Sequence, residues 1–273
     1  ILSNGEYSVM LNSAGTGFSR CGELAVTRWH EDPTTDLAGF HLYLREKQTG
    51  QLWSATHLPV GKSPDSFEAI FTEHKAEFLR EDGSWHSQLE IVVSSENNVE
   101  LRQLTLSNRS LSTAEIEITS YLEPVLLRPE ADLAHPAFGK LFFQTEKLEK
   151  HRALLGHRRP RGAEDTEPWV FHLLAGTEET SQWECETDRA RFLGRNRTLA
   201  NPDGLTQPLS SSVGNVLDPA FVIRHSVRIP AEGTCRLCFV TGVADSREEA
   251  LRLIDRYQEA NAFDRESDMA WTR

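Results

Sequence analysis

Residues 123–139 carry the residue types best suited to binding a sugar. This segment reads E-P-V-L-L-R-P-E-A-D-L-A-H-P-A-F-G and contains three prolines. Pro136 restrains His135 to an extended conformation, and Phe138 offers an aromatic face close by. Sugars stack on aromatic faces while polar groups bind their hydroxyls, so His135, Pro136 and Phe138 form a candidate substrate subsite. The plainer alternative is a loop anchored by Phe138, with His135 as a passive hydrogen-bonding group.

Two carboxylates of the same segment are further candidates for substrate binding. Glu123 follows a predicted strand, and Asp132 lies nine residues further on. Either side chain could accept a hydrogen bond from a sugar hydroxyl. Hydrolysis would need two carboxylates that face one cleft and have separated pKa values, and the sequence does not show such a pair. The alternative is a solvated or locally paired carboxylate. We assign no catalytic residue.

Three arginines lie near the ends of early predicted strands: Arg20, Arg28 and Arg45. The planar guanidinium group suits bidentate contact with an anion such as phosphate. Arg20 and Arg28 are therefore candidate ligand-binding residues, although paired surface or interface arginines are more common.

The cysteines do not indicate a metal or redox site. Cys235 and Cys238 form a C-x-x-C pair, a spacing found in zinc and redox sites. Here the pair falls in an apparent strand, which places the two thiols on opposite faces, and no second pair follows. We expect reduced, partly buried thiols, no metal and no cofactor. The G-T-G of residues 15–17 is interpreted as a backbone bend with positive φ, because no strand and helix follow it as a nucleotide loop requires.

Composition limits the classes of partner. The 273 residues have a formal net charge of -12, which argues against nucleic acid and against anionic lipid as broad electrostatic partners. No apolar run approaches the ~18–20 residues needed to span a bilayer, so we expect no direct membrane insertion. The first residue is Ile, and the opening residues already have a strand pattern. We therefore expect the chain to be an excised piece of a longer protein.

The elements that must position these residues are mostly strands. Alternation of apolar and polar residues, with turn signals between the runs, predicts a large antiparallel β-sandwich. The predicted strands are 7–11, 40–45, 51–55, 67–72, 75–80, 85–94, 99–107, 114–122, 140–145, 153–157, 169–174, 221–229 and 234–244. Residues 81–84 form a turn with Asp82 and Gly83 at its centre. Residues 123–139 and 188–205 are predicted to be irregular excursions.

The pattern changes after Ala244. Asp245 has the character of a helix N-cap, acidic residues follow it, and Leu251 and Ile254 recur at helical spacing. We predict an all-β domain over residues 1–244 and the start of a helical linker over residues 245–273.

Ordered blocks along nearly the whole chain resemble one family. They include N-G-E-Y-S-V-M-L-N-S-A-G-T-G-F-S-R, W-S-A-T-H-L-P, S-Y-L-E-P-V-L, A-D-L-A-H-P-A-F-G-K-L-F-F-Q-T-E, E-T-D-R-A-R-F-L-G-R, V-G-N-V-L-D-P-A-F and G-V-A-D-S-R-E-E-A-L. These blocks resemble the phosphorylase-type region of cyclic β-1,2-glucan synthases and, more distantly, the phosphorylases of glycoside hydrolase family 94, formerly glycosyltransferase family 36.

The resemblance implies a β-supersandwich of the galactose mutarotase type, a helical linker and then an (α/α)6 barrel. The barrel carries the general acid and most of the phosphate site, so the resemblance implies that this chain is inactive alone. It also implies a β-glucan or oligosaccharide ligand, contact with the barrel of the parent chain and homodimer formation. In the D-x-x-H-P-x-F block, Asp132, His135, Pro136 and Phe138 would close over a neighbouring barrel. The domain would lie on the cytoplasmic side, in a parent associated with the inner membrane.

Three functions follow as hypotheses. The first is a noncatalytic sugar-handling domain that shapes a cleft for the missing barrel of a β-1,2-glucan synthase or phosphorylase. The second is an aldose mutarotase-like enzyme that uses His and Glu as acid and base. The third is a purely structural interaction domain without sugar contact.

Overall fold

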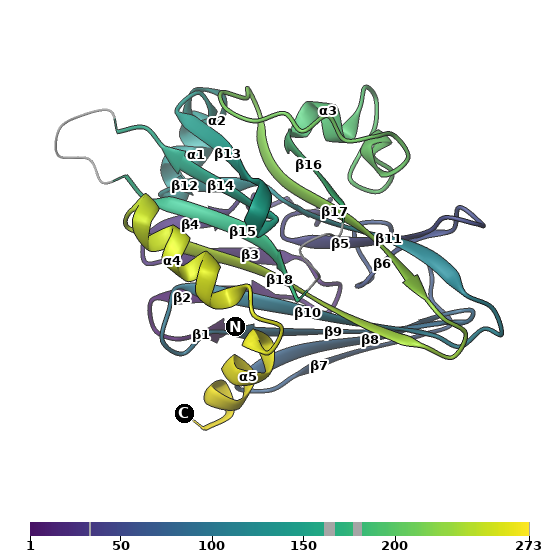
Figure 1. Ribbon diagram of the computed structural model, residues 1–273. Coiled ribbons are helices and arrows are strands. Elements are labelled where there is room, and N and C mark those ends of the chain that lie inside the picture. The colour runs from purple at the N-terminus through teal and green to yellow at the C-terminus, as the bar shows by residue number, and fades with distance from the viewer. Residues whose placement is uncertain (33, 161–166, 177–181, 273) are drawn as a thin grey trace.

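Three antiparallel sheets build the fold (Figure 1). A computed structural model describes residues 1–32, 34–160, 167–176 and 182–272. The first sheet has the order β1 (Leu2–Ser3), β2 (Tyr7–Leu11), β3 (Gly17–Cys21), β4 (Leu24–Thr27) and β12 (Pro124–Leu127). The second has the order β13 (Phe143–Leu148), β14 (Ala153–Arg158), β15 (Trp169–Ala175), β18 (Thr234–Ala244), β10 (Val99–Asn108), β9 (Trp85–Val93), β8 (Lys75–Asp82) and β7 (Ser66–Phe71). The third has the order β16 (Trp183–Asp188), β17 (Pro219–Ile229), β11 (Ala114–Leu122), β5 (His41–Glu46) and β6 (Leu52–Ser54). The predicted antiparallel all-β fold is confirmed.

Strand alternation sorts the side chains of the eight-stranded sheet between two apolar clusters. On β10, Leu104 and Leu106 belong to the main core, which all three sheets share. Val99 and Leu101 of the same strand belong to a second cluster on the outer face. Since successive side chains of a strand point to opposite faces, a strand between two apolar layers needs apolar residues on both.

Two helices cover this outer face. α4 (Arg247–Tyr257) buries Leu253 and Ile254 in the second cluster, and α5 (Ala262–Thr272) buries Phe263 there (Figure 1). The N-cap of α4 is Ser246, whose Oγ accepts a hydrogen bond of 3.1 Å from the Glu249 amide. The predicted helical stretch after residue 244 is present as two helices, and the first begins just after the expected Asp245. The division of the chain at residue 244 stays a prediction.

Two predicted irregular segments contain regular elements. Residues 123–139 hold β12, α1 (Pro129–Ala134) and most of α2 (Pro136–Lys140). A proline opens each of these short helices, where its missing N–H is tolerated, so prolines that suggested a loop mark helix starts. Because α2 includes Lys140, the predicted strand at 140–145 begins only at Phe143. Residues 188–205 hold α3 (Arg189–Leu193) and the 3-10 turn η2 (Asp203–Leu205).

The other differences are local. Strands β3, β4 and β16 were not predicted, because each is short and lies beside glycines or charges. The turn between β8 and β9 has Gly83 and Ser84 as its two central residues, since Asp82 pairs with Trp85. The bend with positive φ at residues 15–17 is confirmed, with φ of +88° at Gly15 and +154° at Gly17.

A third apolar cluster covers the outer face of the third sheet. Tyr43 on β5 and Tyr121 on β11 point away from the main core and pack with Phe192 and Leu193 of α3. The segment around α3 and η2 therefore closes the middle of this face. The apolar cluster ends near Tyr121, and a hollow lies beside it at the end of β11.

Candidate functional site

The hollow at the end of β11 has a volume of about 460 Å³. The segment after β4, the residues before β5, the end of α2, and α3 with the loop after it supply its walls. Its charged and aromatic lining residues are Arg28, His30, Asp32, Tyr121, Glu123, Lys140, Arg189 and Arg197. Four cations and two carboxylates thus border one hollow in an acidic protein.

Glu123 is the centre of the hydrogen bonding in this hollow. Its Oε1 accepts 2.6 Å from the Tyr121 hydroxyl and 2.7 Å from Nε of Arg189. Its Oε2 lies 3.2 Å from Nε of Arg28. Oε1 is therefore held by two hydrogen bonds, whereas Oε2 is paired with Arg28 by charge and keeps a lone pair that can accept a hydrogen bond from a ligand.

The pKa values of its partners follow from burial and charge. Burial and the charge of Glu123 raise the pKa of Tyr121 well above the ordinary value, which keeps its hydroxyl a neutral donor. Burial lowers the pKa of Arg189, but the charge and hydrogen bond of Glu123, together with Tyr121 and Asp218, outweigh this effect and the net shift is upward. The wall of the hollow therefore presents a permanent cation beside a phenol hydroxyl.

Ion pairs continue from Glu123 in both directions. Nη1 of Arg28 donates to both oxygens of Asp132, each at 2.8 Å. On the other side, Arg189 lies 3.4 Å from Asp218, which binds Nζ of Lys140 at 2.5 Å. The alternating chain of charges is Asp132, Arg28, Glu123, Arg189, Asp218 and Lys140. It ties the ends of β4 and β11 to α1, α2 and α3.

The structure brings three of the predicted site residues together, namely Arg28, Glu123 and Asp132. Glu123 borders the hollow, whereas Asp132 is buried behind Arg28 with 4% of its surface exposed. Asp132 therefore matches the locally paired alternative. The role of these residues in sugar binding stays a prediction.

His135, Pro136 and Phe138 lie beside the hollow but do not line it. They are exposed on the α1–α2 hairpin, where Phe138 is 51% exposed and packs edge-on against Phe142 at 5.1 Å. Arg20 is elsewhere: it lies on β3 with its guanidinium 4.6 Å from the centre of the Phe18 ring. Of the other early arginine candidates, Arg45 pairs with Glu117 at 2.5 Å.

Sequence reasoning missed Tyr121, Lys140 and Arg189. The alternation of β11 places Tyr121 on the face opposite Ile116 and Ile118, and that was a usable signal. The Arg-rich segment 188–205 was noted, but its link to Glu123 depends on tertiary structure.

The buried histidines are not placed for acid–base work in this hollow. His41 lies under Tyr121, with ring centres 6.4 Å apart, and burial lowers its pKa to about 4. Burial also lowers the pKa of His172 to about 3, and this ring contacts Ser120 at 2.8 Å and Thr241 at 2.9 Å between the sheets. His30, at the rim, is the exposed histidine of the hollow.

Over the described ranges, no group of three or more His, Cys, Asp or Glu side chains is arranged to hold a metal ion. Cys235 packs against the main core and Cys238 lies in the second cluster, so the two thiols are on opposite faces as predicted. All four cysteines are free. In the part of the chain that the structure describes, no helix is long and apolar enough to cross a bilayer.

Comparison with known proteins decides the family. The family model of the glycosyl hydrolase 94 supersandwich domain matches residues 1–260. The chain belongs to this family. The supersandwich architecture inferred from the sequence blocks is thereby confirmed, together with the three-sheet arrangement described above.

Two relatives are long enzymes of which this domain spans a part. The chain is 40% identical to the cyclic beta-(1,2)-glucan synthase NdvB of Rhizobium meliloti (strain 1021), over 100% of this chain and 10% of that protein. It is 22% identical to the N,N'-diacetylchitobiose phosphorylase of Vibrio proteolyticus, over 93% of this chain and 31% of that protein. Among solved structures, a bacterial glucoamylase complexed with acarbose aligns over 99% of this chain and 39% of its own, with 9% identity and a TM-score of 0.48.

Proposed function

We propose that this supersandwich domain is a noncatalytic carbohydrate-handling part of a β-1,2-glucan synthase or phosphorylase. Its task is to shape a cleft and to contact the saccharide, while an (α/α)6 domain of the parent chain supplies the proton donor. The similarity to a glucan synthase over the full chain and to a phosphorylase over 93% of it supports this proposal. As part of the same proposal, the domain lies on the cytoplasmic side of the inner membrane.

The observation that carries the proposal is the set of contacts that hold the Glu123 carboxylate in place. Arg28 and Arg189 contact its two oxygens, and the Tyr121 hydroxyl donates to it as well. A general acid or base needs an oxygen that can reach the substrate proton, whereas a binding site needs fixed donors and acceptors. The hollow offers the second arrangement, and sugar hydroxyls fit such donors and acceptors.

The α1–α2 hairpin is proposed as the surface that meets the catalytic domain or the second subunit. Leu133 and Phe138 are 55% and 51% exposed on it, next to the exposed His135. The ion pair between Asp132 and Arg28 holds the hairpin against β4. A rigid hairpin with an apolar tip suits closure over a neighbouring site, since little order has to be gained on contact.

Titration of the 273-residue chain with linear β-1,2-linked glucooligosaccharides, followed by calorimetry and NMR, tests the proposal. We expect weak binding, with a Kd on the order of 1 mM. The backbone amide signals of residues around the hollow should shift during the titration. Glu123→Gln should weaken binding at least about fivefold, because a carboxylate acceptor and the positions of Arg28 and Arg189 are lost. Glu117→Gln is the matched control: its side chain is 13% exposed against 14% for Glu123, and its partner is also an arginine.

Each hypothesis has its own outcome. Turnover of β-1,2-glucan by the chain alone would overturn the noncatalytic role. Accelerated mutarotation of glucose or galactose, measured by polarimetry and lost in His30→Ala, would support the mutarotase alternative instead. If no NMR signal of the folded chain shifted at the highest ligand concentration, the result would support a purely structural domain.

A further inference from the structure

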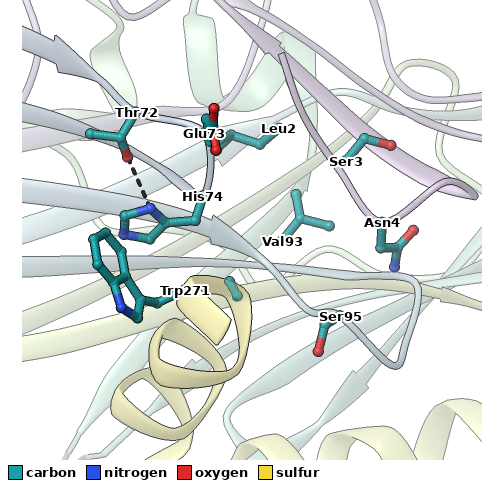
Figure 2. Close-up of a pocket in the computed structure, with 10 residues that line it drawn as sticks. Leu2, Ser3, Asn4, Thr72, Glu73, His74, Val93, Ser95 and Trp271 are labelled. Carbon is teal, nitrogen blue, oxygen red and sulfur yellow. Dashed lines mark hydrogen bonds between the residues drawn. The ribbon is translucent and has the colours of Figure 1, made fainter. Parts of the chain in front are cut away.

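A second hollow lies far from Glu123, where the end of α5 meets the edge of the eight-stranded sheet (Figure 2). Its volume is about 650 Å³. Figure 1 shows α5 well apart from α2 and α3, so the two hollows are separate. Leu2 and Val93 give it an apolar floor, and polar groups of Asn4 and Glu73 stand around it.

Trp271 is the distinctive side chain of this hollow. It comes from the last turn of α5 and is 73% exposed. His74 meets its ring edge-on, with ring centres 4.9 Å apart and planes at 80°. Nδ1 of His74 lies 3.2 Å from the Thr72 hydroxyl, and Figure 2 shows these three side chains along one wall. The indole is therefore braced by a neighbour and still open to solvent.

The N-terminal half of the helix that carries Trp271 is buried against the sheet. Ala262 and Phe263 are 1% and 3% exposed in the second apolar cluster. Glu266 is fully buried and lies 3.5 Å from Arg265 and 4.0 Å from Arg256. The buried start of α5 and the edge-on contact with His74 together restrict the indole before any ligand arrives, which lowers the entropy lost on binding.

We propose that this hollow is a second saccharide-binding site, in which a β-linked glucopyranose residue stacks on Trp271. The faces of a β-glucopyranose ring carry axial C–H groups and suit an indole, while its equatorial hydroxyls point sideways toward polar groups. The Glu73 carboxylate makes no hydrogen bond or ion pair with another described residue, so it is available as an acceptor. The glucan class of the ligand rests on the proposed function, whereas the site itself rests on this geometry.

The test follows the indole N–H signals of the 15N-labelled chain by NMR during titration with linear β-1,2-linked glucotetraose. Trp271→Phe assigns the Trp271 signal. We expect this signal to shift and to saturate. Trp271→Ala should weaken binding at this site about tenfold, measured on backbone amides of residues 72–74, whereas Trp271→Phe should keep most of it. Because Trp271 is exposed, both variants should unfold at the temperature of the parent chain.

Two controls separate this site from other binding. Trp183→Ala removes a partly buried indole that Lys147 covers at 4.6 Å, and it should leave the Trp271 response unchanged. Glu123→Gln should also leave it unchanged, so failure of the first hollow and failure of this one are distinguishable. A Trp271 signal that does not move, or a Trp271→Ala variant that binds as tightly at residues 72–74, would overturn the proposal.

Discussion

Arg28 holds Asp132 by both carboxylate oxygens, each 2.8 Å from Nη1, although the two residues lie 104 positions apart in the sequence. Asp132 belongs to α1, a helix of six residues that could not persist alone. The pair fixes this helix to the end of β4 and fixes Arg28 beside Glu123. One buried ion pair thus positions both the wall of the hollow and the exposed hairpin next to it.

Arg28→Ala should reduce the free energy of unfolding by about 3–5 kcal/mol, because it leaves the Asp132 carboxylate buried without its counter-charge. Urea denaturation measures this change. Arg109→Ala is the control: Arg109 is 58% exposed and pairs with Glu81, which is 40% exposed, so its loss should cost less than about 1 kcal/mol. Equal costs in the two variants would show that the Arg28 network contributes little to stability.

Stability should fall as the pH drops through the range from 6.5 to about 4. Burial lowers the pKa of His41 to about 4 and that of His172 to about 3, against 6.5 for an ordinary histidine. In this range the unfolded chain binds protons that the folded chain does not. Each of the two histidines therefore lowers the free energy of unfolding by about 1.4 kcal/mol for every unit by which the pH falls.

Urea denaturation at several pH values tests this expectation. His172→Gln should show a smaller pH dependence of the free energy of unfolding than the parent chain, by the contribution of one histidine. His74→Gln alters a partly exposed ring at the edge of the sheet and serves as the control. An unchanged slope in His172→Gln would mean that His172 takes up its proton in the folded state.

Ile254→Ala should lower the free energy of unfolding by about 2–5 kcal/mol if α4 folds as one unit with the sheet. Ile254 is fully buried against the outer face of the eight-stranded sheet. Arg252→Ala changes a side chain of the same helix that is 76% exposed, and should alter stability by less than about 0.5 kcal/mol. A small effect of Ile254→Ala would support a separate linker beginning at residue 245.

The cysteines should react slowly with a disulfide reagent in the folded chain. Burial raises the pKa of Cys21 and Cys185 to about 11 and that of Cys238 to about 12, and it raises the pKa of the half-buried Cys235 as well. The thiolate is the reactive form, so the first three thiols should react at least about 100-fold more slowly than unfolded cysteine. Each cysteine that reacts releases one thiol from the reagent, and the absorbance of that thiol follows the reaction. In urea, all four cysteines of the same sample should react. Fast labelling of Cys238 in the folded chain would show local opening of β18.

The sequence by itself determined most of the long strands and the helical stretch after them. Residues 114–122 and 234–244 were predicted with the bounds that the structure has, because period-two alternation depends only on neighbouring side chains. The helical start after Ala244 followed in the same way from capping and helical spacing. Family membership, too, rests on ordered blocks of residues and needs no coordinates.

Only the tertiary structure decided which side chains meet. Whether Glu123 was solvated or paired depended on Arg28 and Arg189, which come from segments far away in the chain. The order of strands in the sheets brings them together, and no local pattern encodes that order. Trp271 is similar: it falls in the predicted helical stretch after residue 244, but the exposure of its indole beside His74 depends on how α5 packs across the sheet. Side-chain chemistry is local, whereas the partners of a side chain are set by the packing of the whole fold.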